Sequence, residues 1–126
     1  MKRIINTSNA PAPIGPYNQA VLHNGILFTS GQIAIDPITG SLDNSDIKKE
    51  TIRVMENLKA VLAEANMTFD NVIKSTIFIS DMNDFTLINE VYASYFKGDN
   101  APARETVEVA RLPKDVNIEI SMIAAK

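Results

Sequence analysis

The sequence has no cysteine, no tryptophan and only one histidine among its 126 residues. Without cysteine the chain has no disulfide, thiolate nucleophile, iron–sulfur cluster or thiolate zinc site. The single histidine, His23, is too little for an imidazole metal site or a serine–histidine relay. Its place before Asn24-Gly25 indicates a solvated turn residue. There is also no P-loop, no G-x-G-x-x-G motif and no cluster of metal ligands, so we expect no metal centre and no cofactor.

Long apolar runs and a strong charge of either sign are also absent. No stretch approaches the ~18 apolar residues of a membrane span, and no apolar signal-peptide core follows the basic start at Met1–Ile5. We therefore expect a cytoplasmic protein without a membrane partner. A formal net charge of −3 gives little support to nucleic acid as a partner. A chain of 126 residues with 45% hydrophobic content is typical of one folded domain, spanning residues 1–126.

Hydrophobic periodicity predicts an α+β domain. Ala10–Pro16 forms a shaped loop, because its three prolines lack N–H donors. The expected elements are strands at 17–22, 26–30 and 32–35, a helix at 46–65, a strand at 72–79, a second helix from Asp84 to Gly98, and strands at 104–110 and 117–124. Two amphipathic helices then cover one face of one mixed sheet. The other face, with Phe78, Thr106 and Ile123 among its side chains, has a mixed polarity that predicts a subunit interface.

Arg104 is the first candidate for a functional side chain. It begins a predicted strand in which Arg104, Thr106 and Glu108 share one face. A guanidinium binds a planar carboxylate through two parallel hydrogen bonds, which fixes the orientation of a small acid. On the local pattern alone, an ordinary solvated arginine is the simpler interpretation.

Glu119 is the second candidate. Its neighbours Ile118 and Ile120 point to the helix side of the last strand, so Glu119 faces the predicted interface. A partly buried carboxylate tends to have a raised pKa and can exchange protons with water near neutrality. If the last two strands pair directly, Glu119 also lies on the same side as Arg104. The pattern alone leaves a solvated strand glutamate as the alternative.

Two hydroxyl residues near the N-terminus are weaker candidates. Ser30 is not in a nucleophile elbow, because the G-x-S-x-G spacing and a base histidine are missing. The sequence favours a role in binding a substrate or the backbone of a neighbouring subunit. Tyr17 follows Gly15-Pro16, where its ring either covers a pocket or packs on the sheet.

Six motifs extend from the Pro-rich loop to the last strand: Ile14–Tyr17, Thr29–Ile33, Asn89–Tyr92, Pro102–Arg104, Val107–Asp115 and Ile118–Ile120. They are similar to motifs of the RidA/YjgF family, also called the L-PSP endoribonuclease family, and the segment ending at Asp115 is the most specific. The resemblance implies a chorismate-mutase-like subunit and a homotrimer with a cleft between neighbouring subunits. It also implies cofactor-free hydrolysis of enamines and imines, such as 2-aminoacrylate and 2-iminopropanoate, to 2-keto acids and ammonia.

The resemblance also assigns roles to residues. By position, Arg104 corresponds to the arginine that binds the substrate carboxylate, and Glu119 to the glutamate that positions or activates water. Residues that correspond to the lining of the cleft are Tyr17, Ser30, Gly31, Asn89 and Thr106. The chain departs from the family at Thr106, where cysteine is usual, and at Glu105, where a small serine is usual. We expect Thr106 to serve as a small spacer and Glu105 to point away from the cleft.

The expected function is deamination of 2-imino acids. An iminium carbon is already electrophilic, so orientation by Arg104 and proton exchange by Glu119 suffice for its hydrolysis. A regulator that binds a small 2-keto acid in the same cleft without catalysis is the alternative, because Thr106 replaces the usual cysteine. Ribonuclease activity or inhibition of translation receives little support from an acidic chain with one histidine.

Overall fold

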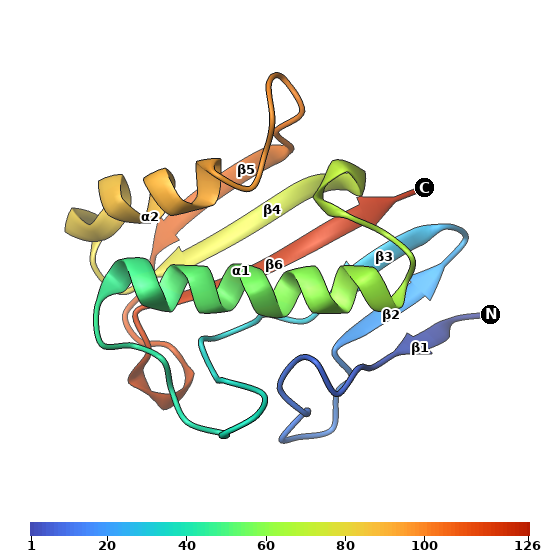
Figure 1. Cartoon of the computed structure of the whole chain (residues 1–126), viewed down its shortest axis with the longest axis horizontal. Helices are drawn as coiled ribbons and strands as arrows, with labels where there is room; N and C mark the ends of the chain where they lie inside the picture. The colour runs from blue at the N-terminus through green and yellow to red at the C-terminus, as the bar shows by residue number, and fades with distance from the viewer.

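A computed structural model describes the whole chain, residues 1–126. One six-stranded sheet has both helices on the same face (Figure 1). The elements in chain order are β1 (Arg3–Ile5), β2 (Ala20–His23), β3 (Ile26–Thr29), α1 (Ile47–Glu64), η1 (Phe69–Asn71), β4 (Val72–Ile79), η2 (Met82–Asp84), α2 (Phe85–Ala93), β5 (Ala103–Glu108), η3 (Pro113–Asp115) and β6 (Ile118–Ala125). The predicted α+β class, with two helices on one face of a mixed sheet, is confirmed.

The sheet has the strand order β1-β2-β3-β6-β4-β5. All neighbouring strands are antiparallel except β4 and β5, which are parallel and connected by α2. The last strand in sequence, β6, therefore lies in the middle of the sheet, and β5 forms an edge (Figure 1). The expectation that the last two strands pair directly is wrong, because β4 lies between them.

The core forms between α1 and the central strands. Asp46 caps α1, since its side chain accepts a hydrogen bond from the Lys49 N–H at 2.9 Å. The buried stripe of the helix contains Val54, Met55, Leu58, Val61 and Leu62, and it faces Ile77, Ile79, Ile118, Ile120 and Met122 of β4 and β6. Burial of each such side chain contributes about 1.5–3 kcal/mol, which fixes the central strands on which Glu119 and its neighbours lie.

The N-terminal region departs from the predicted strands. The first strand, at Arg3–Ile5, was not expected, and β2 begins at Ala20 instead of Tyr17. Gln19, only 2% exposed, explains the late start. Its side chain donates to the carbonyl oxygens of Thr7, Ala10 and Pro11 and accepts from the Thr7 N–H, so it organises the Pro-rich loop.

Residues 32–35 do not form the predicted strand. Gln32 pairs with Ile120 in one isolated bridge, and the chain then leaves the sheet. The Asn57 side chain of α1 donates to the carbonyl oxygens of Ile33 and Ile35 at 3.1 and 3.0 Å, which replaces strand pairing. This segment consequently lies beside the sheet, where it contributes to the wall of a pocket described below.

Two predicted turn signals have different outcomes. Asn24 and Gly25 have φ angles of 51° and 76°, which is the geometry of the predicted tight hairpin between β2 and β3. In contrast, α2 ends at Ala93 and not at Gly98, and Asp84 precedes it without a side-chain capping bond. Neither helix has the length and apolar character needed to cross a membrane.

Candidate functional site

Arg104 and Glu119 lie on opposite faces of the sheet, contrary to the expectation that they share one side. Arg104 is paired with Ser75 of β4, whose side chain is buried on the helix side. Glu119 is paired with Phe78 of β4. Ser75 and Phe78 are three residues apart in one strand, so their side chains point to opposite faces. The predicted site is therefore divided into two parts within one chain.

The first part is a small pocket around Glu119, with a volume of about 90 Å³. It brings together three predicted site residues, Tyr17, Gly31 and Glu119. Such a volume holds about three water molecules or a few ligand atoms. Burial raises the pKa of the Glu119 carboxyl above its ordinary value, and the side chain forms no ion pair that would counter this effect. The pocket therefore presents a carboxyl group suited to proton exchange.

Gly31 touches the Glu119 carboxyl group so closely that any side chain at this position would displace it. A Cβ atom at position 31 would lie 2.6 Å from Cδ and 2.7 Å from Oε1 of Glu119. Ordinary contacts between non-bonded carbon atoms are about 3.5–4.0 Å. The backbone N–H of Gly31 forms no hydrogen bond within the chain. Gly31 thus gives the carboxyl group its space and adds a free donor beside it.

A turn with unusual backbone angles forms another wall of the Glu119 pocket. Pro113 and Lys114 line the pocket, and Lys114 and the following Asp115 both have φ angles of 56°. Two consecutive left-handed residues that are not glycine store strain, which is typical of functional sites. Arg111 Nε donates to Asp115 Oδ1 at 2.6 Å across this turn. The ion pair raises the pKa of Arg111 and lowers the pKa of Asp115, so both side chains favour their charged forms, and their attraction stabilises the turn.

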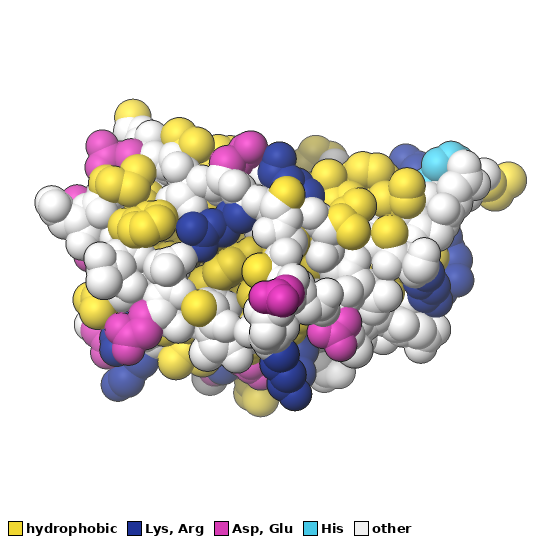
Figure 2. Space-filling model, turned by 90° about the horizontal axis from the view of Figure 1, so that it is seen from above, with side chains coloured by type: hydrophobic (Ala, Val, Ile, Leu, Met, Phe, Trp, Pro, Cys, Tyr) yellow, Lys and Arg dark blue, Asp and Glu magenta, His cyan; other side chains and the backbone are white.

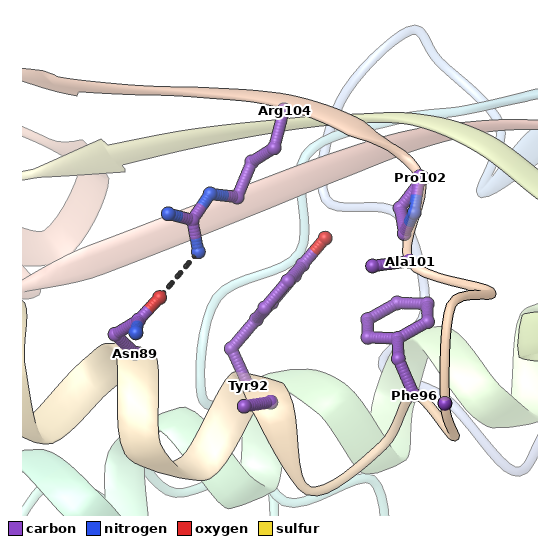
Figure 3. A pocket seen from close by; sticks show the side chains of 8 residues that line it. Asn89, Tyr92, Phe96, Ala101, Pro102 and Arg104 are labelled. Carbon is purple, nitrogen blue, oxygen red and sulfur yellow. Dashed lines mark hydrogen bonds between the residues drawn. The ribbon is translucent and has the colours of Figure 1, made fainter.

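The second part of the site is a larger pocket between α2 and β5, with a volume of about 460 Å³. Its lining includes the predicted residues Asn89 and Arg104 and, beside them, Tyr92, Phe96, Ala101 and Pro102 (Figure 3). Figure 2, which looks onto the β5 edge of the sheet, shows this pocket as a hollow beside a basic side chain, with hydrophobic side chains at its base. It is a pocket with a single cation, and four of its eight lining residues are hydrophobic.

The Arg104 guanidinium is fixed on one side only. Its Nη1 donates to Asn89 Oδ1 at 2.6 Å, as Figure 3 shows. Its central carbon lies 5.1 Å from the centroid of the Tyr92 ring and 5.6 Å from that of Phe85, within the range of cation–π attraction. No carboxylate of the chain forms an ion pair with it. The remaining N–H groups of this oriented cation are therefore free for an anion.

Three further predictions concern residues that line neither pocket. Ser30 donates its hydroxyl to the Asn18 carbonyl at 2.6 Å, so it binds backbone. Thr106 is paired with Ile77 and faces the helix side, so its predicted place on the helix-free face is wrong, and its Oγ1 is buried without a hydrogen-bond partner. Glu105 is paired with Thr76 and lies on the helix-free face, the same face as Glu119, where its Oε1 is 3.2 Å from Lys74 Nζ.

Some residues of the site were not predicted from the sequence. Phe85 and Tyr92 were expected only as the apolar stripe of a helix, although their rings also support the Arg104 guanidinium. Their seven-residue spacing indicated only that the two rings share one face of the helix. The left-handed conformations of Lys114 and Asp115 had no such signal. Among the residues of the chain, no group of three or more histidine or acidic side chains is arranged to hold a metal ion.

Comparisons with known proteins agree with the fold and the motifs. Residues 7–126 match the family described as Endoribonuclease L-PSP. A RutC family protein of Pyrococcus horikoshii is 56% identical over 126 residues, covering 100% of this chain and 99% of that protein. A Salmonella typhimurium protein named 2-iminobutanoate/2-iminopropanoate deaminase is 45% identical over 128 residues, covering 100% of this chain and 99% of its own.

A solved structure has the same fold. The crystal structure of Escherichia coli TdcF with bound serine superposes with a TM-score of 0.93 at 45% identity, and the match covers 98% of each chain. A family match that spans almost the whole sequence, together with relatives of this identity and coverage, is decisive. The chain belongs to the Endoribonuclease L-PSP family, which is the RidA/YjgF family that its motifs indicated.

Proposed function

We propose that this protein hydrolyses 2-imino acids to 2-keto acids and ammonia, without a cofactor, in clefts formed between the subunits of a homotrimer. The observation that carries the proposal is an oriented guanidinium, Arg104, with no carboxylate partner in its own chain. The relative named as a deaminase supports the reaction. The TdcF structure with bound serine supports a small molecule with a carboxylate as ligand.

The division of the site supports a cleft shared between subunits. Arg104 and Glu119 face opposite sides of one sheet, so one small substrate cannot reach both in the same chain. The helix-free face presents exposed Phe28 and Val107 and half-buried Phe78 and Ile123. Contact of this face with another copy would bury apolar surface and bring the Glu119 pocket of one subunit to the Arg104 edge of the next.

The reaction follows from the groups in the two pockets. Arg104 binds the substrate carboxylate, which fixes the adjacent imine carbon. Glu119 accepts a proton from a water molecule while the oxygen of that water bonds to the imine carbon. With a protonated imine as substrate, the resulting tetrahedral intermediate is a neutral carbinolamine. Glu119 returns the proton to its nitrogen, the C–N bond breaks as the hydroxyl oxygen forms the carbonyl, and the hydroxyl proton leaves with the ammonia, so that a keto acid and ammonium result. The raised pKa makes the Glu119 carboxylate a stronger proton acceptor than an ordinary glutamate, which suits it to both proton transfers.

The reaction is tested by adding the protein to 2-iminopropanoate generated from L-alanine by an amino-acid oxidase. We expect faster release of pyruvate than the uncatalysed rate, with loss of the effect in Glu119→Gln. Glu64→Gln is a matched control, because Glu64 is an exposed residue at the end of α1. Binding of pyruvate without any acceleration would refute the deaminase and would favour a regulator that only binds the keto acid.

The shared cleft has a separate test. Arg104→Lys and Glu119→Gln chains are unfolded together, refolded as a mixture and assayed. If each cleft takes Arg104 from one subunit and Glu119 from its neighbour, random mixing restores both residues in about one quarter of the clefts. A mixture no more active than the separate variants, with subunit exchange verified by mass spectrometry, would place the whole site within one chain.

A further inference from the structure

We infer that the pocket between α2 and β5 receives the side chain of the substrate, and that the preferred substrates are 2-imino acids with a branched or otherwise bulky apolar side chain. The inference rests on the proposed function, because it assigns the carboxylate of the same ligand to Arg104. The ligands named for the two relatives above are small: 2-iminobutanoate and 2-iminopropanoate for the Salmonella deaminase, and serine for TdcF.

The first argument is the size of the pocket. A volume of about 460 Å³ corresponds to about fifteen water molecules at roughly 30 Å³ each. The methyl group of 2-iminopropanoate displaces about one of them. Most of the pocket would remain filled with water in contact with apolar walls, which favours a ligand that fills more of the space.

The second argument is the chemistry of the lining. Arg104 is the only charged residue in it, and no acidic side chain is present. Beyond the guanidinium and the Asn89 amide beside it, the apolar part of the wall consists of Ala93 and Phe96 from the α2 side and Ala101 and Pro102 from the segment that leads into β5. Figure 3 shows Arg104 at one end, the Tyr92 ring in the middle, and Phe96, Ala101 and Pro102 at the other end. One carboxylate joined to an apolar group matches this arrangement.

The third argument is that the pocket is held in shape before any ligand binds. The Tyr92 hydroxyl donates to Ser75 Oγ at 2.9 Å, and burial raises the pKa of this phenol, so it remains a neutral donor. The Tyr92 and Phe96 rings lie 4.9 Å apart, and Phe96 also contacts Phe69 edge to face at 5.6 Å. A preformed apolar wall loses little entropy on binding, so the burial of a ligand side chain appears directly in affinity.

The expected preference follows from the buried carbon atoms. Each CH₂ group transferred from water to an apolar site raises affinity about fourfold. The isobutyl group of 2-imino-4-methylpentanoate has three more carbons than the methyl group of 2-iminopropanoate. We therefore expect kcat/KM to favour the larger substrate by up to about 60-fold.

The experiment compares both imines, generated from L-leucine and L-alanine, in the unmodified protein and in Ala101→Leu. The variant fills the pocket, so the ratio of the two kcat/KM values should fall at least tenfold. Ala63→Leu is the matched control, because Ala63 is exposed on α1 and lies outside the pocket; its ratio should remain unchanged. A ratio near one in the unmodified protein, or a ratio that Ala101→Leu does not change, would overturn the inference.

A binding measurement separates this inference from the proposed reaction. Calorimetric titration with 4-methyl-2-oxopentanoate and with pyruvate needs no catalysis. Tighter binding of the larger keto acid, lost in Ala101→Leu and retained in Ala63→Leu, would support the pocket even if no imine were hydrolysed. Equal affinity for the two keto acids would overturn it even in an active deaminase.

Discussion

Replacing Gly31 by alanine tests the pairing of this residue with Glu119. The added Cβ would lie 2.6 Å from Glu119 Cδ and 2.9 Å from Cγ, about 1 Å closer than an ordinary contact. The φ angle of Gly31 is not in the left-handed region, so the backbone accepts alanine. Because the obstacle is a side chain that can rotate, the carboxyl group moves instead of the sheet.

The magnitude follows from that displacement. An off-rotamer side chain costs about 0.5–1.5 kcal/mol, so Gly31→Ala should fold and lose about 1 kcal/mol of stability. A catalytic group displaced by about 1 Å typically costs about 10²-fold in rate. We therefore expect kcat on 2-iminopropanoate to fall about 10²-fold, with little change in the affinity for pyruvate, whose proposed binding group, Arg104, belongs to the other half of the cleft.

A double-mutant cycle gives the sharpest assay. If Gly31→Ala acts only through Glu119, it should have almost no further effect on kcat in the Glu119→Gln background. Gly25→Ala is a control for the loss of a glycine, because nothing lies within 4 Å of its Cβ position. The φ of +76° at Gly25 adds backbone strain, but this strain lies in the β2–β3 hairpin and not at Glu119. Multiplicative effects of Gly31→Ala and Glu119→Gln would refute the close coupling of the two residues.

Four further outcomes follow from the structure. Arg104→Lys keeps the charge but loses the bidentate guanidinium, so kcat/KM should fall roughly 10–150-fold, from about 1.5–3 kcal/mol of lost hydrogen bonding. Arg3→Lys, at an exposed position of β1, should leave kcat/KM unchanged. The pKa of Glu119 is raised in the folded state, so the folded protein binds this proton more tightly than the unfolded chain does. The free energy of unfolding should therefore fall as pH rises from the unfolded pKa through the folded pKa. In chemical denaturation, Glu119→Gln should be more stable than the parent at pH 7 but not at pH 4. Thr106→Val removes a buried hydroxyl without a partner, so the melting temperature should rise by about 4 °C, for about 1 kcal/mol, and an unchanged value would indicate that water satisfies the hydroxyl. Sedimentation equilibrium at micromolar concentration should give three times 13.8 kDa, and a monomer would refute the shared cleft.

The sequence by itself determined the class of fold and most elements. The apolar period of α1, the alternation of β4 and the Asn24-Gly25 hairpin depend on residues close together in the chain. Such local patterns are readable because the same backbone geometry creates them in every context. The motifs also identified the family and singled out Arg104 and Glu119.

Only the tertiary structure decided how those residues are arranged. That β6 lies between β3 and β4 depends on contacts between distant segments, and it places Arg104 and Glu119 on opposite faces. The ends of the N-terminal strands could not be predicted from the sequence either, because the side chains of Gln19 and Asn57 bind backbone groups that strand pairing would otherwise satisfy. Strand order and side-chain hydrogen bonds to remote backbone leave no periodic signal, since they depend on which surfaces meet after the elements have formed.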